Sequence, residues 1–406
     1  MLRLLIVLLA SQLSAAVAIR DDAGVIKDSD GTAVATYAAR IPTLGPKDPP
    51  PGLIVALHGI NGNEKQLIDA CKLSLQAADR ESGYVVLGLK SQGAGWEVVD
   101  HERIRKAVAW AIATHRVDPR RVFGWGYSHG AIRLGHFAAE AQDLFAGAVL
   151  WAGTCQRTPE DGNGIAYYVV HGESDPTVKP DNIRAARDMM RKLGVRLVYR
   201  EYAGGDHGAP FSKGRGAWAD HVLWLDALRN ARIPLDAKAG EVLSKAGAEL
   251  DKDGKLGTAT AKALLPVLAD NAGPAIDACV VRCLTATVPA LRRSAAALCA
   301  KRLYGDSVIT ALLALADDAD KETQSQAIKA LALAADFQIA PAQELLCATV
   351  REHKSPAVRN STLQELLPAL RAQKGTVAFD PPFAQLLETL RKTPSPALQK
   401  ILDELK

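Results

Sequence analysis

The stretch VFGWGYSHG, residues 122–130, decides the fold of this 406-residue chain. An apolar run typical of a buried strand leads into GYSHG, a G-x-S-x-G motif, and a helical pattern begins at Ala131. The glycines two residues either side of Ser128 let the chain turn sharply from strand to helix, which leaves the serine hydroxyl exposed above a helix N-terminus. This arrangement is that of a nucleophile elbow, so Ser128 is predicted to be a nucleophile.

A serine hydroxyl is a poor nucleophile unless an imidazole takes its proton and a carboxylate orients that imidazole. After such an elbow the partners are expected in the order Ser, Asp, His, each at the carboxyl end of a later strand. Asp175 lies in HGESDPTV just after one strand-like run, and His207 lies in YAGGDHGAP after the next. We therefore predict that Asp175 is the acid and His207 the base, with Glu173 as an alternative acid.

Acyl transfer also needs fixed N–H donors for the oxyanion that develops in the transition state. One predicted donor is the backbone N–H of His129, directly after the nucleophile. The other is the N–H of Ile60 in the loop HGINGN, where Gly59 allows close backbone approach. Trp96 and Trp151 lie at strand ends, and we predict that they are either aromatic walls of the substrate site or packing residues.

Strand-like runs alternate with helical patterns from about residue 21 to residue 230, which predicts an α/β fold with a mostly parallel sheet flanked by helices. Ligands gather at the carboxyl ends of the strands in such a sheet. The predicted strands are 53–57, 84–89, 121–127, 145–151, 166–170 and 196–202, with 32–41 as a candidate edge strand. The predicted helices are 65–80, 101–115, 131–142, 181–193 and 216–230.

Strand signals stop after Asn230, and short helical patterns rich in Ala and Leu continue to the end of the chain. We expect a catalytic domain over residues 19–235 and an all-helical domain over residues 236–406. The same apolar register follows Arg292, Gln324 and Arg359, which resembles HEAT-like repeats, in which helix pairs stack into a solenoid. An ordinary helical bundle is an equal alternative.

Residues 1–18 combine Arg3, a short apolar run and a small-x-small ending, which predicts a cleaved signal peptide and a secreted or periplasmic protein. No later run has the length of a membrane span. The formal net charge of +4, without a basic cluster, gives no case for a nucleic-acid partner.

The six cysteines are too few for a fold built on disulfides at this length. Export would permit a Cys71–Cys155 bond, which nothing else in the sequence supports. The other four fall in helical patterns without neighbouring ligands, so we interpret them as core residues rather than zinc ligands; they are Cys279, Cys283, Cys299 and Cys347. An aspartate-rich turn at residues 251–260 lacks the glutamate of a calcium loop, and no cofactor or metal is expected.

Four runs resemble the α/β-hydrolase superfamily: LIVALHGINGN (53–63), DPRRVFGWGYSHGA (118–131), DLFAGAVLWAG (143–153) and YYVVHGESDPTV (167–178). More narrowly, they are similar to exported esterases of the polyhydroxybutyrate depolymerase and feruloyl esterase group, with dienelactone hydrolases and carboxylesterases nearby. The likeness covers about residues 50–230.

This resemblance implies hydrolysis of carboxylic esters through an acyl-enzyme, with Ser128 as nucleophile, Asp175 as acid, His207 as base, and Ile60 and His129 as oxyanion donors. Dienelactone hydrolases have a cysteine where this chain has Ser128, which argues against that activity. The helical half is not part of the usual esterase.

Only a short segment separates the strand-like runs on either side of residues 152–165, which leaves little room for a cap domain. An open site would suit short acyl groups or ester substituents on a polymer. Two other functions are consistent with the sequence: a serine peptidase of the prolyl oligopeptidase type, and a helical-repeat scaffold with a degenerate hydrolase domain. The helical domain could bind a protein or a polymer.

Overall fold

The computed structural model describes residues 18–154, 165–392 and 396–405. The predicted signal peptide, apart from its last residue, and Cys155 therefore lie outside the described residues. Within the described ranges, none of the helices is both long and apolar enough to cross a membrane.

One sheet of eight strands forms the centre of the first half of the chain, in the order β1-β2-β4-β3-β5-β6-β7-β8. The pairs β1–β2 and β2–β4 are antiparallel, and all later pairs are parallel. The predicted α/β fold with a mostly parallel sheet is confirmed. The strands are β1 Ile19–Lys27, β2 Ala33–Pro42, β3 Gly52–Leu57, β4 Tyr84–Leu89, β5 Val122–Tyr127, β6 Gly147–Trp151, β7 Ala166–Gly172 and β8 Leu197–Tyr202.

All six predicted strands are present, and so is the strand predicted at 32–41. That strand, β2, was expected at an edge but lies between β1 and β4. β1 was not predicted. Its residues IRDDAGVIK include four charges, and only Ile26 is buried at this edge of the sheet. An edge strand buries little apolar surface, so its hydrophobic signal is weak.

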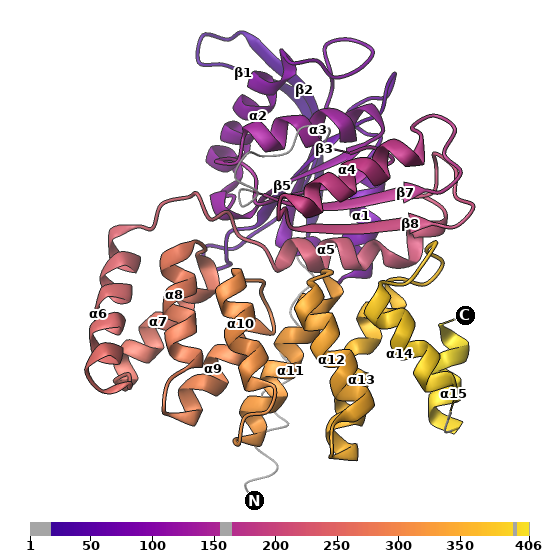
Figure 1. The fold of residues 1–406 in the computed structure, drawn as a ribbon. Helices are drawn as coiled ribbons and strands as arrows, with labels where there is room; N and C mark the ends of the chain where they lie inside the picture. The colour runs from indigo at the N-terminus through magenta and orange to yellow at the C-terminus, as the bar shows by residue number, and fades with distance from the viewer. Residues whose placement is uncertain (1–17, 155–164, 393–395, 406) are drawn as a thin grey trace, which may run out of the picture.

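Helices cover both faces of the sheet (Figure 1). The helices α1 Ile68–Ala77 and α5 Trp218–Asp226 pack on one face, where they contribute Cys71, Leu75, Trp224 and Leu225 to the core. Helices on the other face share a second core; they are α2 Asp100–His115, α3 His129–Glu140 and α4 Pro180–Lys192. Each lies close to its predicted range, although α1 and α5 are shorter than the patterns suggested.

Every element after Ala237 is a helix. The helices α9, α11 and α13 pack side by side in one layer, and α8, α10, α12 and α14 pack in a second, so each helix contacts the one two places along the chain (Figure 1). Their bounds are α6 Ala237–Asp253, α7 Thr258–Asp270, α8 Pro274–Leu284, α9 Pro289–Cys299, α10 Asp306–Leu315, α11 Lys321–Asp336, α12 Ala340–Glu352, α13 Pro356–Arg371, α14 Pro381–Lys392 and α15 Pro396–Glu404.

The recurring register has a structural counterpart. Arg292 and Arg359 each donate a hydrogen bond to the carbonyl oxygen six residues earlier, in the turn before their own helix. Gln324 at the equivalent place in α11 donates to the carbonyl oxygen of Ala316, at the end of α10. These side chains satisfy backbone acceptors that a helix end or turn leaves free.

The helical half lies along the open edge of the sheet. The N–H of Val377 donates to Glu201 at 2.8 Å and the N–H of Ala203 donates to Gly375 at 3.1 Å, so residues 375–377 pair with the end of β8 as a short extra strand would. An exposed edge strand is a template for aggregation. The helical half therefore covers an edge that the sheet alone would leave open.

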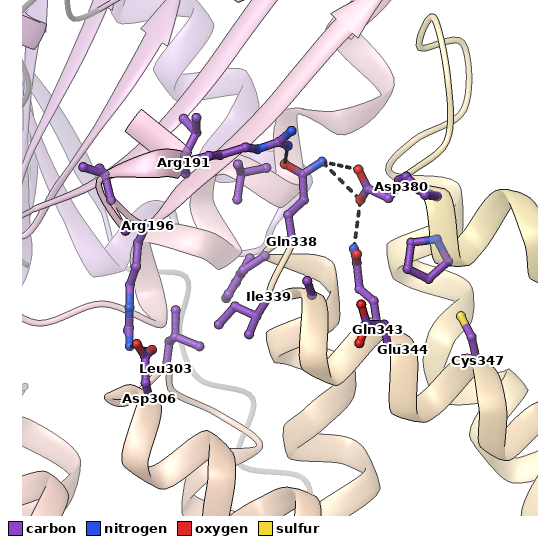
Figure 2. A pocket seen from close by; sticks show the side chains of 18 of the residues that line it. Arg191, Arg196, Leu303, Asp306, Gln338, Ile339, Gln343, Glu344, Cys347 and Asp380 are labelled. Carbon is purple, nitrogen blue, oxygen red and sulfur yellow. Dashed lines mark hydrogen bonds and ion pairs between the residues drawn. The ribbon is translucent and has the colours of Figure 1, made fainter. Parts of the chain in front are cut away.

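A side chain of the helical half extends this pairing. The amide of Gln338 accepts a hydrogen bond from the N–H of Tyr199 at 2.8 Å and donates to its carbonyl oxygen at 3.2 Å. Figure 2 shows Gln338 and Gln343 converging on the carboxylate of Asp380, to which Gln373 also donates. Three side-chain amides thus donate to the carboxylate of Asp380. These contacts hold Gln338 in the position where it pairs with β8.

The sheet half and the helical half share one hydrophobic core. The cluster on the α1 and α5 face continues from Trp224 and Leu228 to Leu303, Tyr304 and the interior of the helical layers. The predicted boundary at residues 235 and 236 falls between α5 and α6, while the division into two domains stays a prediction. Cys279, Cys283, Cys299 and Cys347 are buried and unbridged, as expected of core residues.

Candidate active site

The chain turns sharply at Ser128, between β5 and α3. Its backbone has φ 52° and ψ −120°, a conformation that costs a non-glycine residue free energy and that persists only where the surroundings enforce it. The Ser128 N–H donates to Trp151 at 2.8 Å, and the Ser128 carbonyl accepts the N–H of Ile132 at 3.0 Å. The strained residue is therefore held on both sides, by β6 and by the first turn of α3.

The glycines of the motif permit this packing. A Cβ on Gly126 would lie 2.6 Å from the Cα of Ala131, and a Cβ on Gly130 would lie 2.2 Å from the carbonyl oxygen of Leu57. Both distances are shorter than any real carbon contact. The N-terminus of α3 can thus approach the end of β3, which brings the loop after β3 next to the serine.

The three residues predicted to act together do meet. The Ser128 Oγ lies 2.9 Å from Nε2 of His207, and Nδ1 of His207 lies 2.7 Å from Oδ2 of Asp175. Ser128 and Asp175 are buried, at 7% and 3% exposure, whereas the His207 side chain is 21% exposed. With its proton on Nδ1, the ring donates to the carboxylate and accepts from the serine hydroxyl. This is the geometry that nucleophilic activation requires.

The other oxygen of Asp175 is held by the backbone. Oδ1 accepts the N–H of Thr177 at 2.8 Å and that of Val178 at 3.0 Å. His171 lies beneath this loop, with Nε2 2.9 Å from the carbonyl oxygen of Val178 and 3.5 Å from Oδ2 of Asp175. Burial lowers the pKa of His171, so its neutral ring supports the loop as a donor.

Glu173, the alternative acid, has a different partner. Its carboxylate accepts the N–H of Gly204 at 2.8 Å, and its own N–H donates to Tyr202 at 3.1 Å. Ser174 donates its N–H to Gly205 at 2.7 Å. Glu173 therefore ties the loop that carries Asp175 to the loop that carries His207, and it does not orient the imidazole.

The tight contact of these two loops leads to a first prediction. A Cβ on Gly172 would lie 2.2 Å from the carbonyl oxygen of Asp206 and 2.5 Å from that of Gly205. Gly172→Ala should push the loop that carries His207 away from the loop that carries Asp175. A displacement near 1 Å costs about a hundredfold in rate. Ester turnover at equal folded concentration measures the effect. The control is Gly216→Ala, whose Cβ would meet nothing within 4 Å; equal activity of the two variants would contradict the proposed role of this contact.

The loop after β3 lies beside the nucleophile, because a Cβ on Gly59 would be 3.5 Å from the Cβ of Ser128. The carbonyl oxygen of Gly59 accepts hydrogen bonds from Nδ1 of His58 at 2.6 Å and from the N–H of Gly62 at 3.0 Å. In a trans peptide the following N–H, that of Ile60, points the opposite way. The N–H of His129 is at the first position of α3, where a helix provides no partner.

His58 fixes the direction of that peptide. Its Nε2 accepts the N–H of Ser91 at 3.2 Å, so the proton resides on Nδ1 and is donated to Gly59. Burial lowers the pKa of His58, which keeps the ring in this neutral form. No role was predicted for His58 from the sequence, although a histidine before a glycine directly after a buried strand is a usable signal.

A second prediction concerns this histidine. His58→Phe keeps a ring of similar shape but removes the donor to Gly59, so the Ile60 N–H should lose its fixed direction. We expect kcat to fall by about tenfold to a hundredfold, less than the loss of an oxyanion donor itself, with KM nearly unchanged. His58→Asn restores an N–H near the Nδ1 position and should recover part of the rate in the same assay. An unchanged kcat in His58→Phe would show that the peptide is held by other means.

Both candidate substrate tryptophans are inside the protein, at 1% exposure for Trp96 and 0% for Trp151. The Trp96 indole donates to the carbonyl oxygen of His58 at 2.9 Å, and its backbone N–H donates to Nδ1 of His129 at 3.1 Å. Trp151 stacks on Trp218, with ring centroids 5.7 Å apart. Neither residue can be a wall of an open site, so the packing alternative holds for both. Strand ends in a parallel sheet are buried by the helices, which the sequence position alone did not reveal.

Tyr127, for which the sequence predicted no role, also lies beside the candidate site. The ring of Tyr127 lies 5.3 Å from that of His207 and 4.9 Å from that of Phe211. The Tyr127 hydroxyl donates to the carbonyl oxygen of His207 at 3.4 Å. Burial is the main cause that raises the pKa of this hydroxyl, so the tyrosine stays protonated. Tyr127 thus contacts the loop that carries His207 and helps to hold it in place.

An apolar rim lies on the segments that follow β3 and β4. It consists of Ile60, Val98 and Val99, whose exposures are 60%, 66% and 60%. Their two loops are joined by a hydrogen bond from the N–H of Asn61 to the carbonyl oxygen of Ala94, at 2.6 Å. Large apolar side chains exposed on adjacent loops of a catalytic edge are candidates for ligand contact.

Comparison with known proteins gives relatives for part of the chain, although no family model matches it. An acetylxylan esterase of Coprinopsis cinerea is 33% identical over 117 residues, which cover 26% of this chain and 31% of that protein. A protein of Neosartorya fischeri named "Probable acetylxylan esterase A" is 25% identical over 181 residues, which cover 32% of this chain and 49% of that protein. The chain thus spans a third to a half of the length of these relatives.

Solved structures that align with about half of the chain include an esterase of Pyrobaculum calidifontis, with a TM-score of 0.41 and 17% identity, covering 51% of this chain and 85% of that one. A structure titled "ferulic acid esterase" has a TM-score of 0.43 and 12% identity, covering 51% of this chain and 98% of that one. The strand order, with two antiparallel pairs followed by parallel strands, and the strained serine directly after β5 agree with the fold that the sequence resembles. The first half of this chain has the α/β-hydrolase fold, and a run of helices from α6 to α15 follows it.

Proposed function

We propose that this chain is a serine hydrolase that cleaves carboxylic esters through a covalent acyl-enzyme. The observation that supports this best is the continuous set of contacts from Ser128 through His207 to Asp175, at 2.9 Å and 2.7 Å. An accidental cluster would not also place the serine on a strained turn at a helix N-terminus. No metal or cofactor has a role in the proposed reaction.

In the first half of the reaction, Nε2 of His207 takes the hydroxyl proton as Ser128 Oγ attacks the ester carbonyl carbon. The carbonyl oxygen becomes an oxyanion, which the N–H groups of Ile60 and His129 stabilise. The intermediate then collapses: the bond to the alcohol oxygen breaks, and His207 returns its proton to that oxygen. Asp175 holds the ring in the tautomer that performs both transfers and stabilises its transient positive charge.

In the second half, water replaces the alcohol. His207 removes a proton from a water molecule, whose oxygen attacks the acyl carbonyl carbon, and the second tetrahedral intermediate expels Ser128 Oγ. The serine regains its proton from His207, and the carboxylic acid leaves. The partial exposure of the His207 side chain gives water access to the base.

We propose short acyl groups, acetyl in particular, carried by a polysaccharide as the substrate class. Two observations support this: the curated relatives include proteins named acetylxylan esterases, and Ile60, in the loop beside Ser128, exposes an apolar side chain that an acyl group can contact.

Export and domain organisation complete the proposal. The charged and apolar pattern of residues 1–18 supports secretion or passage to the periplasm, where a polymer substrate would be met. We propose a catalytic domain over residues 19–235 and a short HEAT-like array over residues 236–406. The two-layer packing of α8 to α14 and the repeated positions of Arg292, Gln324 and Arg359 support the array.

A substrate panel tests the proposal. Purified protein is assayed with 4-nitrophenyl acetate, 4-nitrophenyl octanoate, methyl ferulate, acetylated xylan and a proline nitroanilide. We expect turnover of the acetate and release of acetate from xylan, with the octanoate at least about tenfold poorer, as the proposed preference for short acyl groups requires. Cleavage of the nitroanilide alone would identify a peptidase, and no turnover of any substrate would contradict the enzyme proposal in favour of a scaffold.

A further inference from the structure

A cavity of about 740 Å³ lies in the seam between the sheet half and the helical half. Its lining includes Ala146 and Ala166, at the amino ends of β6 and β7, and one side of α8. Because Ser128 follows the carboxyl end of the parallel strand β5, this cavity is at the opposite edge of the sheet from the candidate active site. A neighbouring cavity of about 850 Å³ shares Arg196, Leu303 and Asp306 with it; Figure 2 shows all three.

The lining carries an excess of positive charge. It has four guanidinium groups and two carboxylates: Arg196, Arg229, Arg282 and Arg302 against Asp277 and Asp306. Arg196 is paired with Asp306, at 3.2 Å. Arg282 is half-exposed and paired with Asp251, also at 3.2 Å. Among the described residues of the lining, this leaves Arg229 and Arg302 against the single carboxylate of Asp277.

These two arginines have no carboxylate oxygen within 4.0 Å in the part of the chain that the structure describes. Arg302 is 4% exposed, and its Nη1 donates to the carbonyl oxygens of Leu268 and Ala269, both at 2.7 Å. Nη1 of Arg229 donates to two carbonyl oxygens of its own turn, at 2.9 and 2.8 Å. Nε of each arginine is buried and has no hydrogen-bond acceptor among the described residues.

The two guanidiniums also repel each other. Burial lowers the pKa of Arg302 to about 10, and the charge of Arg229 contributes to the decrease. Burial likewise lowers the pKa of Arg229. A buried and a half-buried guanidinium with unused donors are unfavourable side by side, because carbonyl oxygens carry only partial charge. An anion in the cavity would neutralise both groups and accept from their free donors.

The chemistry of the lining favours one class of anion. Two guanidiniums suit a compact group with two negative charges and several acceptor oxygens, which describes a phosphoryl group. The first turn of α10, at Gly305 to Ser307, also lines the cavity and contributes the positive end of a helix dipole. The volume exceeds that of inorganic phosphate, so a small phosphate ester would also fit. We propose that this seam cavity is a binding site for a phosphoryl group, free or on a small molecule.

Calorimetric titration of the full chain with inorganic phosphate, and separately with glucose 6-phosphate, tests this at constant ionic strength with chloride as the reference anion. Arg229→Gln removes one of the unpaired charges, and Ala278→Glu adds a negative charge at an exposed position of the lining. Both changes should weaken binding at least about tenfold. Asp277→Asn removes a competing carboxylate while retaining an acceptor, and it should tighten binding several-fold. Arg293→Gln changes a paired arginine of the helical half outside this lining and is the matched control.

Binding that weakens in the first two variants, strengthens in Asp277→Asn and is unchanged in Arg293→Gln supports the site. A preference for glucose 6-phosphate over phosphate identifies an ester as the ligand, and the reverse identifies the free ion. No heat of binding in the parent chain, or equal affinity in all four variants, would overturn the proposal. Neither Ala278→Glu nor Asp277→Asn breaks an ion pair within 4.0 Å of the two arginines, so their opposite effects do not depend on the stability of Arg229→Gln.

Discussion

Replacing Ser128 by alanine is expected to reduce kcat for a short-chain ester by about ten-thousandfold to a millionfold, the range seen when an acyl-transfer nucleophile is removed. The reason is that no other hydroxyl occupies the position 2.9 Å from Nε2 of His207 that Ser128 Oγ holds. The oxyanion donors and the base would remain, and residual activity would come from water attacking directly. The measurement is the initial rate with 4-nitrophenyl acetate.

The fold should not change in this variant. The hydrogen bonds that hold residue 128, to Trp151 and from Ile132, use backbone atoms that alanine keeps. Thermal unfolding should therefore differ by only a few degrees. Ser212→Ala is the matched control, because Ser212 is an exposed serine five residues after His207. Its hydroxyl donates to the carbonyl oxygen of Gly208 over a long distance, 3.3 Å. It should retain parental activity within about twofold. Equal rates in Ser128→Ala and the parent would show that the nucleophile is elsewhere.

Deleting residues 236–406 is expected to make the remaining sheet half insoluble on expression. The cut would expose the core around Trp224 and Leu228, which continues into Leu303 and Tyr304 of the helical half. It would also uncover β8, because the hydrogen-bond partners of the Tyr199, Glu201 and Ala203 backbone lie in the deleted part. An open strand edge next to exposed apolar surface is a combination that leads to aggregation.

The measurement is the soluble fraction after expression, compared with the parent chain. A smaller change tests the same contact without deletion: Gln338→Asn keeps a residue that tolerates the positive φ of 58° but shortens the amide that pairs with Tyr199. Loss of these two hydrogen bonds should lower Tm by about 2–4 °C. A soluble, active fragment of residues 19–235 would show instead that the helical half is an independent module.

The sequence predicted the elements that bring the candidate site together because their signals are local. The pattern GYSHG requires small residues on both sides of a strained serine, and the structure shows why: a Cβ on Gly126 or Gly130 would overlap the backbone. Asp175 and His207 could be proposed as acid and base because each follows a buried strand, where a polar residue in a glycine-containing loop is conspicuous.

The features that the sequence did not reveal depend on contacts between distant segments. The burial of Trp96 results from the loop after β3, whose His58 carbonyl accepts its indole N–H. The role of Glu173 depends on Gly204, a residue of the opposite loop. The amide of Gln338 pairs with β8 across 139 residues of sequence, and nothing in the periodicity of α11 distinguishes that glutamine from a surface residue.

Labelling with a fluorophosphonate, followed by peptide mass mapping, tests the central proposal most directly, because the reagent forms a stable phosphonyl ester only with an activated nucleophile. We predict a single adduct on Ser128 that forms together with the loss of esterase activity, and a rate of labelling at least about a hundredfold lower in His207→Ala. An adduct on another residue accompanied by loss of activity, or full inactivation with Ser128 unmodified, would contradict the proposed acyl-enzyme.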